Sequence, residues 1–271
     1  MLLRIEDKNN LEIFVAICQL LKQWSSHISM QFNKDKLYVQ SMDKSHVCLT
    51  TITLKSKWFQ YYECNEATNV CVDSSHFAVL MTYALKHSIL ELKFVAEEEP
   101  DKLYISFLNK KEEGEQGVDK KTKKKEASFE HFFELNLMDV DDIEMNIPAV
   151  DYEVDFNIET KKWVDVLNEL NTIGQDLVIV CKEDLIELNV SGDAAKLKVH
   201  IPVGELNEYA IAEDSTLEVS YSLSHLSKMC CSTKLSLNVE VSLSNDYPMM
   251  LKYDLGQESS ALFYIAPKIH N

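Results

Sequence analysis

The chain contains little glycine and little proline, and this scarcity excludes several kinds of site. Only six of its 271 residues are glycine and five are proline. None of the glycines belongs to a G-x-x-x-x-G-K-[ST] or G-x-G-x-x-G loop, so no phosphate-cradling loop is present. The G-x-S-x-G elbow and the H-E-x-x-H motif are missing as well. We therefore expect a protein that is not an enzyme and that needs no cofactor.

The cysteines follow no disulfide or zinc pattern. There are seven, an odd number, and no C-x-x-C pair occurs, although Cys230 and Cys231 are adjacent. Reduced thiols packed as small hydrophobic side chains fit this arrangement best. One alternative stays open, in which Cys64, Cys71 and His76 bind a metal and the chain is an enzyme. We expect no metal, because no second ligand pair has the spacing of a structural zinc site.

A surplus of basic residues is also missing. Lysine and arginine number 27 against 44 acidic residues, which gives a formal net charge of −17. This balance argues against a protein that grips nucleic acid with its whole surface, but it allows one that encloses DNA and touches it lightly. The longest apolar stretch, residues 13–21, is far shorter than the ~20 residues that span a bilayer. We expect a soluble intracellular protein without a membrane partner.

Helical periodicity recurs in the two halves of the chain. Residues 9–24 carry apolar side chains on one face, with Val15 on the opposite face and Asp7 among the candidate N-caps. Residues 160–171 repeat the pattern, and Gly174 is expected to close that helix as a left-handed C′ glycine. Two shorter helices are expected at residues 74–84 and 223–231.

Strand patterns follow each long helix in a similar order. The expected strands are residues 28–32, 37–40, 47–54, 89–95 and 103–107, and then 177–181, 185–190, 197–201, 217–221, 235–243, 249–253 and 261–265. The repeated order predicts an α+β fold of two topologically similar domains, each with antiparallel sheets and two helices. A single large α/β domain is the alternative, and the lack of long crossover helices counts against it.

The expected domain boundaries follow from two segments of unusual composition. Residues 135–152 are acidic but hold regularly placed apolar side chains, which predicts an extended connecting loop lying against the body of the protein. Residues 109–126 hold seven lysines and five acidic residues and form a lysine-rich insertion. The N-terminal domain is thus predicted at 1–134 and the C-terminal domain at 153–271. The lysines at 120–125 could contact DNA, direct nuclear import or simply be solvated.

Four segments carry a resemblance to a known family. Residues 37–47 (LYVQSMDKSHV) and 262–268 (LFYIAPK), with 137–139 (LMD) and 146–148 (NIP), resemble the proliferating cell nuclear antigen family of DNA sliding clamps. The resemblance implies three copies joined head to tail into a ring, whose helices line a channel for duplex DNA. It also implies a polymerase processivity factor in the nucleus. The divergence suggests a viral or parasitic source and, if viral, a viral replication compartment.

The resemblance implies a pocket for partner peptides. Its ligands would be Gln-x-x-aliphatic-x-x-aromatic-aromatic peptides of DNA polymerase, clamp loader, flap endonuclease and ligase. The matching positions are Met42, His46, Val47, Leu49, Met145, Ile147, Pro148, Tyr152, Pro248, Tyr264, Ala266 and Pro267.

The resemblance also implies a DNA channel and a subunit interface. The channel positions are Lys22, Lys86, Lys161, His225 and Lys228, which is fewer basic groups than the family usually has. The interface would pair residues 129–137 of one subunit with 195–201 of the next. Its expected side chains are Phe129, Phe132, Phe133, Leu135, Leu197, Val199 and Ile201.

The sparse channel leaves a second interpretation open. A clamp-like interaction or regulatory subunit would bind partners without encircling DNA, or would form part of a heteromeric ring. The intact segments at 42–47 and 263–268 favour the homotrimeric clamp.

Overall fold

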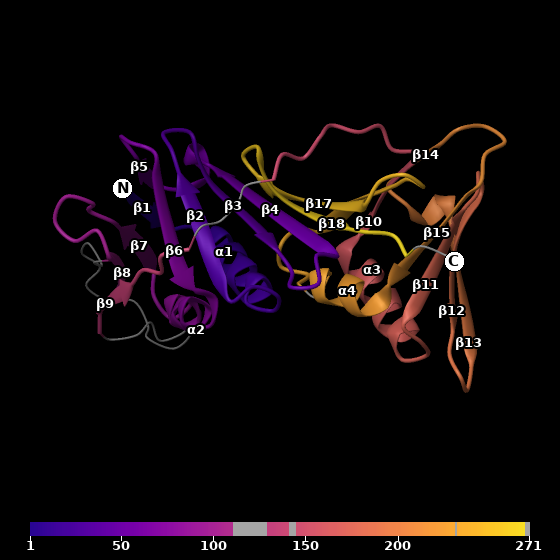
Figure 1. Ribbon diagram of the computed structural model, residues 1–271, viewed down its shortest axis with the longest axis horizontal. Helices are drawn as coiled ribbons and strands as arrows, with labels where there is room; N and C mark the ends of the chain where they lie inside the picture. The colour runs from indigo at the N-terminus through magenta and orange to yellow at the C-terminus, as the bar shows by residue number, and fades with distance from the viewer. Residues whose placement is uncertain (111–128, 141–144, 231, 269–271) are drawn as a thin grey trace, which may run out of the picture. The chain divides into compact units, whose positions relative to one another are not determined.

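A computed structural model describes residues 1–110, 129–140, 145–230 and 232–268 (Figure 1). The chain forms two compact units. Unit 1 comprises Met1–Val39 and Leu54–Asp142, and unit 2 comprises Gln40–Thr53 and Ile143–Asn271. The segment Gln40–Thr53 therefore groups with the second half of the sequence, although it was expected within the N-terminal domain. The physical reason is strand pairing, because this segment lies antiparallel to the last strand of the chain.

Unit 1 is built from two helices and antiparallel strands. One sheet has the order β5-β1-β7-β8-β9, and β2 pairs with β3 on one side and β6 on the other. Its elements are β1 (Leu2–Ile5), α1 (Lys8–Leu21), β2 (His27–Phe32), β3 (Lys36–Met42), β5 (Tyr61–Glu63), β6 (Thr68–Asp73), α2 (Ser74–Ala84), β7 (Ile89–Lys93), β8 (Lys102–Leu108) and β9 (His131–Asn136), with a 3-10 turn at Ser56–Trp58.

Unit 2 has a similar composition of elements. One set of strands follows the order β14-β10-β16-β17-β18-β4, and a separate four-stranded sheet follows β13-β12-β11-β15. Its elements are β4 (Cys48–Lys55), β10 (Val154–Glu159), α3 (Thr160–Asn171), β11 (Asp176–Cys181), β12 (Leu185–Ser191), β13 (Lys196–Pro202), β14 (Glu208–Ile211), β15 (Leu217–Ser222), α4 (Leu223–Met229), β16 (Asn238–Leu243), β17 (Met249–Gly256) and β18 (Ser259–Ile265), with a 3-10 turn at Val203–Glu205.

The helices pack in pairs, α1 on α2 and α3 on α4, within their own units. Asp7 caps α1 by accepting a hydrogen bond from the Asn10 N–H at 2.9 Å, as the sequence predicted. The expected exposed position of Val15 is wrong, since only 5% of its surface is exposed. The packing of α2 explains this burial, and the Gln19 side chain donates to the Ala78 carbonyl of α2 at 2.7 Å.

The expected role of Gly174 is also wrong. Helix α3 ends at Asn171, Thr172 caps it in right-handed geometry, and Gly256 is the glycine with positive φ among the described residues. Glycine is needed at position 174 because residues 190 and 191 of β12 approach its backbone closely. A Cβ there would lie 2.7 Å from the Ser191 carbonyl oxygen and 2.8 Å from a Val190 methyl group.

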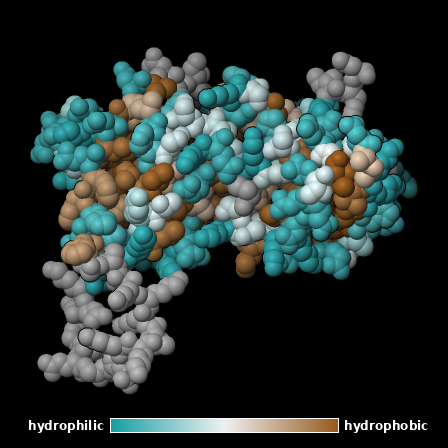
Figure 2. Space-filling view, turned by 90° about the horizontal axis from the view of Figure 1, so that it is seen from below, coloured by the Kyte–Doolittle hydropathy of each residue, from teal (hydrophilic) through white to brown (hydrophobic). Residues whose placement is uncertain are grey.

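The α+β prediction of two similar clamp domains with antiparallel sheets and two helices each is confirmed for the described part of the chain. Among the described helices, none has the length and apolar character needed to cross a bilayer. On the face drawn in Figure 2, hydrophilic side chains predominate and hydrophobic ones gather in separate groups.

Candidate functional site

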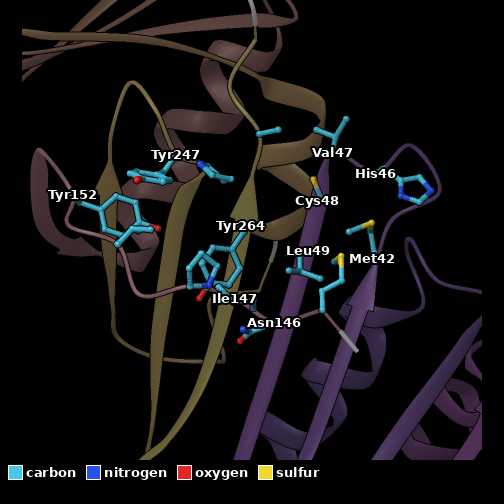
Figure 3. A pocket seen from close by; sticks show the side chains of 15 residues that line it. Met42, His46, Val47, Cys48, Leu49, Asn146, Ile147, Tyr152, Tyr247 and Tyr264 are labelled. Atoms are coloured by element: carbon cyan, nitrogen blue, oxygen red, sulfur yellow. The ribbon is translucent and has the colours of Figure 1, made fainter. Parts of the chain in front are cut away.

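A largely apolar pocket of about 270 Å³ lies within unit 2 (Figure 3). Its lining contains every position expected for the peptide pocket except Pro267. Four further residues line it that the sequence reasoning missed, namely Cys48, Asn146, Val150 and Tyr247. Three of the four segments that carried the family resemblance therefore meet at one place, and 137–139 is the one that does not line the pocket.

Strand pairing and two loop contacts bring these segments together. Strand β18 pairs with β4 so that Tyr264 lies opposite Leu49. Just beyond this pairing, the Ala266 N–H donates to the Val47 carbonyl at 3.0 Å. The connecting segment is held by Gln40, whose side chain donates to the Met145 carbonyl at 3.0 Å and accepts from the Met145 N–H at 2.7 Å.

The loop that follows β3 is organised by one buried carboxylate. Asp43 is 8% exposed and accepts hydrogen bonds from the N–H groups of Cys48 at 2.6 Å, Val47 at 2.8 Å and Ser45 at 3.0 Å. The Ser45 hydroxyl donates to the same carboxylate. Burial opposes ionisation, but these hydrogen bonds to the charged form outweigh it and lower the pKa of Asp43. The loop is thus fixed around a negative charge.

His46 is carried by this loop in the left-handed region, with φ at 58°. Such a conformation is unusual for a residue with a side chain and requires support from its surroundings. The Asp43 carbonyl supplies part of that support by accepting from the His46 N–H at 3.0 Å. The side chain of His46 is thereby exposed at the rim of the pocket.

The two sides of the pocket differ in chemistry. Tyr152 and Tyr247 lie on one side, Met42 and Leu49 on the other, and Tyr264 between them (Figure 3). Burial raises the pKa of Tyr152 to about 12, so its hydroxyl is neutral at ordinary pH. Tyrosine and methionine together offer a neutral surface that accommodates apolar plugs of varied shape.

Cys48 belongs to the apolar lining and not to a reactive site. Burial, followed by the nearby charge of Asp43, raises the pKa of the Cys48 thiol to about 12, against the opposing effect of Lys228. The thiol therefore stays protonated and packs as a small hydrophobic group.

The missed lining residues lie close to expected ones. The family resemblance placed neither Cys48 nor Asn146 in the pocket, although each is next to a residue that it did place there, and Val150 lies between the expected Pro148 and Tyr152. Tyr247 precedes Pro248, which favours extended backbone and directs the two side chains differently. Tyr247 is 41% exposed in the structure, and exposed tyrosine is enriched at binding surfaces, but the sequence alone does not show that exposure.

The predicted channel residues do not share one environment. Lys22, Lys161 and Lys228 are exposed at helices α1, α3 and α4. Lys86 is exposed just after α2, with its ammonium group 5.7 Å from the centre of the Tyr83 ring. His225 differs from the lysines, because its ring nitrogens contact Ser45, Asp43 and Ser222 of its own unit.

The residues expected at the first interface edge lie on or just before β9. This strand has β8 as its neighbour and forms an edge of its sheet. Phe129 and Phe132 are 74% and 70% exposed, whereas Phe133 and Leu135 are half-buried. Among the described strands none pairs with the outer side of β9, and two exposed aromatic rings lie at this edge.

The opposite expected edge, β13, is arranged differently. It pairs with β12 and also forms a sheet edge. Leu197 and Val199 are half-buried and Ile201 is 7% exposed, because alternation turns these apolar side chains toward the unit's own interior. Ile201 therefore does not present its side chain for contact, and the exposed residues of this strand include Lys196, Lys198 and His200.

The suggested metal site is not assembled. Within the described ranges, no group of three or more histidine, cysteine or acidic side chains is placed to hold a metal ion. Cys64 donates to the Glu66 carbonyl, Cys71 is buried, and His76 contacts Asp73 at 2.8 Å.

Two similar domains with paired helices, antiparallel sheets and an apolar pocket beside the connecting segment define a clamp-type protein. Family models for the N-terminal and C-terminal domains of proliferating cell nuclear antigen match residues 6–142 and 146–268. The chain belongs to the proliferating cell nuclear antigen family, whose members are non-enzymatic clamps. It is 26% identical over 262 residues to the proliferating cell nuclear antigen of Chaetomium thermophilum, covering 95% of each chain.

Proposed function

We propose that the protein is a DNA sliding clamp that recruits replication and repair proteins through the pocket of unit 2. Family membership supports a clamp-type role. The observation that carries the finer proposal is the pocket itself, where three distant segments join into one apolar cavity of about 270 Å³. Concave, mostly apolar cavities with a few polar groups are the usual form of a binding site.

The proposed ligands are peptides of the Gln-x-x-aliphatic-x-x-aromatic-aromatic type. Their aliphatic and aromatic side chains would enter the cavity and pack against Tyr264 and Leu49. Each buried Å² of apolar surface contributes roughly 25 cal/mol. Peptides from DNA polymerase, clamp loader, flap endonuclease and ligase are the proposed partners. The exposed His46 and the amide of Asn146 provide polar groups at the rim.

Calorimetry with one such peptide tests the pocket. We expect micromolar or tighter binding, and we expect Ile147→Ala to weaken it about tenfold, because the substitution removes apolar surface from the cavity wall. Ile211→Ala on β14, outside this pocket, is the matched control and should bind like the wild type. Absence of heat with the wild type, or identical binding by Ile147→Ala, would refute the assignment.

We further propose that three copies close into a ring through β9 of one subunit and β13 of the next. Both are edge strands, and unpaired edges invite such pairing. Their exposed charges are complementary, with Glu134 on β9 and Lys198 on β13. Each already has a partner in its own chain, Lys102 at 3.1 Å and Glu187 at 3.0 Å, so the attraction guides association more than it strengthens it.

The proposed ring encircles duplex DNA without sequence preference and holds it loosely. Helix α2 contains no lysine or arginine, and α4 contains Lys228 alone. Few phosphates would be neutralised, so we expect a weak dependence of DNA retention on salt. The site of action would be the nucleus, by family resemblance.

The same scarcity of basic residues favours a second candidate, a clamp-like subunit that binds partners without encircling DNA. A polymerase assay on primed circular template separates the two. The clamp should lengthen the products when a loader is present, and linearising the template should remove the effect because a topological ring slides off the ends. Product lengths that do not respond to the protein would favour the second candidate.

A further inference from the structure

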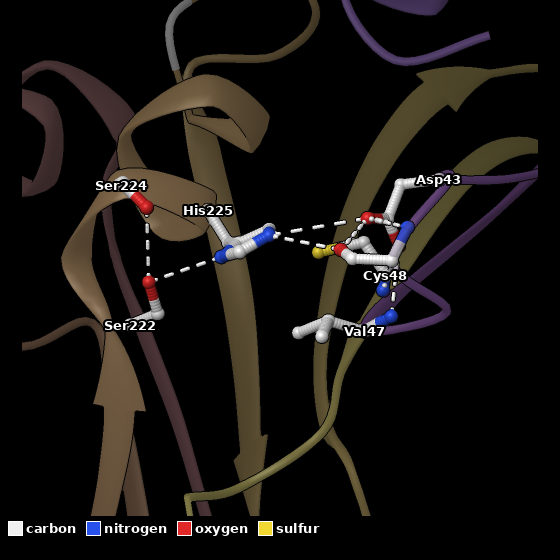
Figure 4. Close-up of polar contacts among 7 residues, drawn as sticks. Asp43, Val47, Cys48, Ser222, Ser224 and His225 are labelled. Carbon is white, nitrogen blue, oxygen red and sulfur yellow. Dashed lines mark hydrogen bonds and ion pairs between the residues drawn. The ribbon is translucent and has the colours of Figure 1, made fainter.

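Helix α4 reaches the pocket wall through a histidine. The Nε2 atom of His225 lies 3.4 Å from the Ser45 hydroxyl oxygen and 3.9 Å from a carboxylate oxygen of Asp43 (Figure 4). On its other side, Nδ1 lies 3.0 Å from the Ser222 hydroxyl, which lies 3.0 Å from the Ser224 hydroxyl. The ring is therefore fixed between α4 and the loop that begins at Asp43.

This loop is the part of the pocket that depends most on polar contacts. His46 and Val47 line the cavity, and Asp43 holds the loop through the backbone N–H groups that follow it. The Val47 carbonyl in turn accepts from the Ala266 N–H, which joins the loop to the C-terminal wall. A shift at Asp43 is therefore transmitted to two walls of the cavity.

We propose that His225 is a positioning residue for peptide docking, which holds the Asp43–Val47 loop in its binding conformation and holds it more firmly when the imidazole is protonated. The inference rests on the proposed peptide-binding function of the same pocket. Among the described residues, His225 does not line the cavity, and its polar contacts on the pocket side are with Ser45 and Asp43 of this loop.

Both charge states of the His225 ring are compatible with the observed contacts, but the protonated ring interacts more strongly with Asp43. In the neutral ring, one nitrogen donates and the other accepts, so Nδ1 can accept from Ser222 while Nε2 donates toward the loop. In the imidazolium both nitrogens donate, and the contact to Asp43 becomes an ion pair. Because the side chain of Asp43 is 9% exposed, this attraction is screened less than at an open surface.

The surroundings of His225 set the direction of this effect. On the loop side, Asp43 is the negative group, and Lys44 and His46 are exposed neighbours. Lys228 lies on α4 itself and acts electrostatically on Cys48. Elements α3, β15 and β18 pack against α4, and in the part of the chain that the structure describes His225 forms no other ion pair. Asp43 is therefore the partner that a protonated ring meets.

The test uses the full chain and a Gln-x-x-aliphatic-x-x-aromatic-aromatic peptide with uncharged flanks. Calorimetry between pH 5.5 and 8.5 should show wild-type binding tighten by about threefold to fivefold as the pH falls, as expected for a partly buried ion pair. His225→Gln should lose this change, and His225→Arg should bind tightly at every pH. His76→Gln in α2, an exposed histidine of unit 1 outside the pocket, is the matched control and should keep the wild-type profile, including any contribution from His46.

A second readout separates this inference from the proposed function. Hydrogen exchange at the Val47 and Cys48 N–H groups reports the loop directly, without peptide, and His225→Gln should exchange faster than the wild type. Equal exchange together with an unchanged pH profile would overturn the inference even if peptide binds well. If His225→Gln exchanges faster but the wild type binds no peptide at any pH, the docking role and the proposed function are both overturned. The contact between His225 and the loop would then be structural only.

Discussion

The side chain of Gln40 holds the backbone of Met145 at two points. Its Nε2 donates to the Met145 carbonyl at 3.0 Å, and its Oε1 accepts from the Met145 N–H at 2.7 Å. Met145 of the connecting segment is thus fixed to Gln40 near the end of β3. Residues 145–148 all line the pocket, so these two hydrogen bonds fix the position of one pocket wall.

Removing this two-point contact should weaken peptide binding. Gln40→Ala is expected to raise the peptide dissociation constant about fivefold to tenfold. Without the two hydrogen bonds, residues 145–148 must become ordered when the peptide binds, which makes binding less favourable. Gln40→Glu keeps an acceptor but loses the donor, so its dissociation constant should lie between those of the wild type and Gln40→Ala. Calorimetry measures this series, and Gln175→Ala, an exposed glutamine outside the pocket, is the matched control. Wild-type affinity in Gln40→Ala would show that the wall is fixed by other contacts.

The glycines of unit 2 allow a stability prediction with an internal control. A Cβ at Gly192 would lie 1.9 Å from the Ile173 carbonyl oxygen, whereas a Cβ at Gly204 would meet no atom within 4 Å. Gly192→Ala should therefore lower the free energy of unfolding by about 1–3 kcal/mol, because backbone must move. Gly204→Ala should leave it nearly unchanged. Urea unfolding of both variants decides the point, and equal stability would contradict the close approach.

The lowered pKa of Asp43 makes a pH prediction. The carboxylate has a lower pKa when folded than when unfolded, so its contribution to stability is complete above the unfolded value and is lost as the pH falls through the folded one. The difference in unfolding free energy between wild type and Asp43→Asn should be constant above about pH 5 and shrink below about pH 4. Urea unfolding across this range measures it, with exposed Asp193→Asn as control. If the difference in unfolding free energy grew toward low pH, the pKa of Asp43 would be raised by folding and not lowered.

The exposed ring of Phe132 should matter for assembly. In the isolated chain this side chain is 70% exposed, on an edge strand. Phe132→Ser should raise the dissociation constant for self-association by tenfold or more, because burying an aromatic ring contributes about 1.5–3 kcal/mol. Leu237→Ser, which alters a side chain that is 84% exposed and belongs to neither edge strand, should leave self-association unchanged. Sedimentation over a concentration series compares the two, and equal effects would exclude β9 from the interface.

The long helices were predictable because their apolar residues recur with helical spacing and a cap precedes the first. The bounds of α2 and α3 agree with the expected ranges 74–84 and 160–171. Strands such as β1 and β14 were not predicted, since they have four residues each and no pattern that distinguishes them from loops. Short edge strands form because a neighbour is available, which sequence periodicity does not show.

The lining of the pocket was largely predictable from the family resemblance, but the forces that build it were not. Periodicity gave no sign that Gln40 would hold Met145, because the two are 105 positions apart. His225 was assigned to the channel by the family resemblance, as a basic residue near Lys228. Its actual contacts with Ser45 and Asp43 depend on how α4 packs against the end of the chain, and only the folded structure shows that.

The ring is the central claim, and the mass of the protein in solution tests it most directly. Sedimentation at physiological salt should give the mass of three subunits, and lowering the salt should promote dissociation, because three chains of net charge −17 carry −51 together. A monomer at every protein concentration and salt concentration would contradict the account and support a clamp-like subunit that does not encircle DNA.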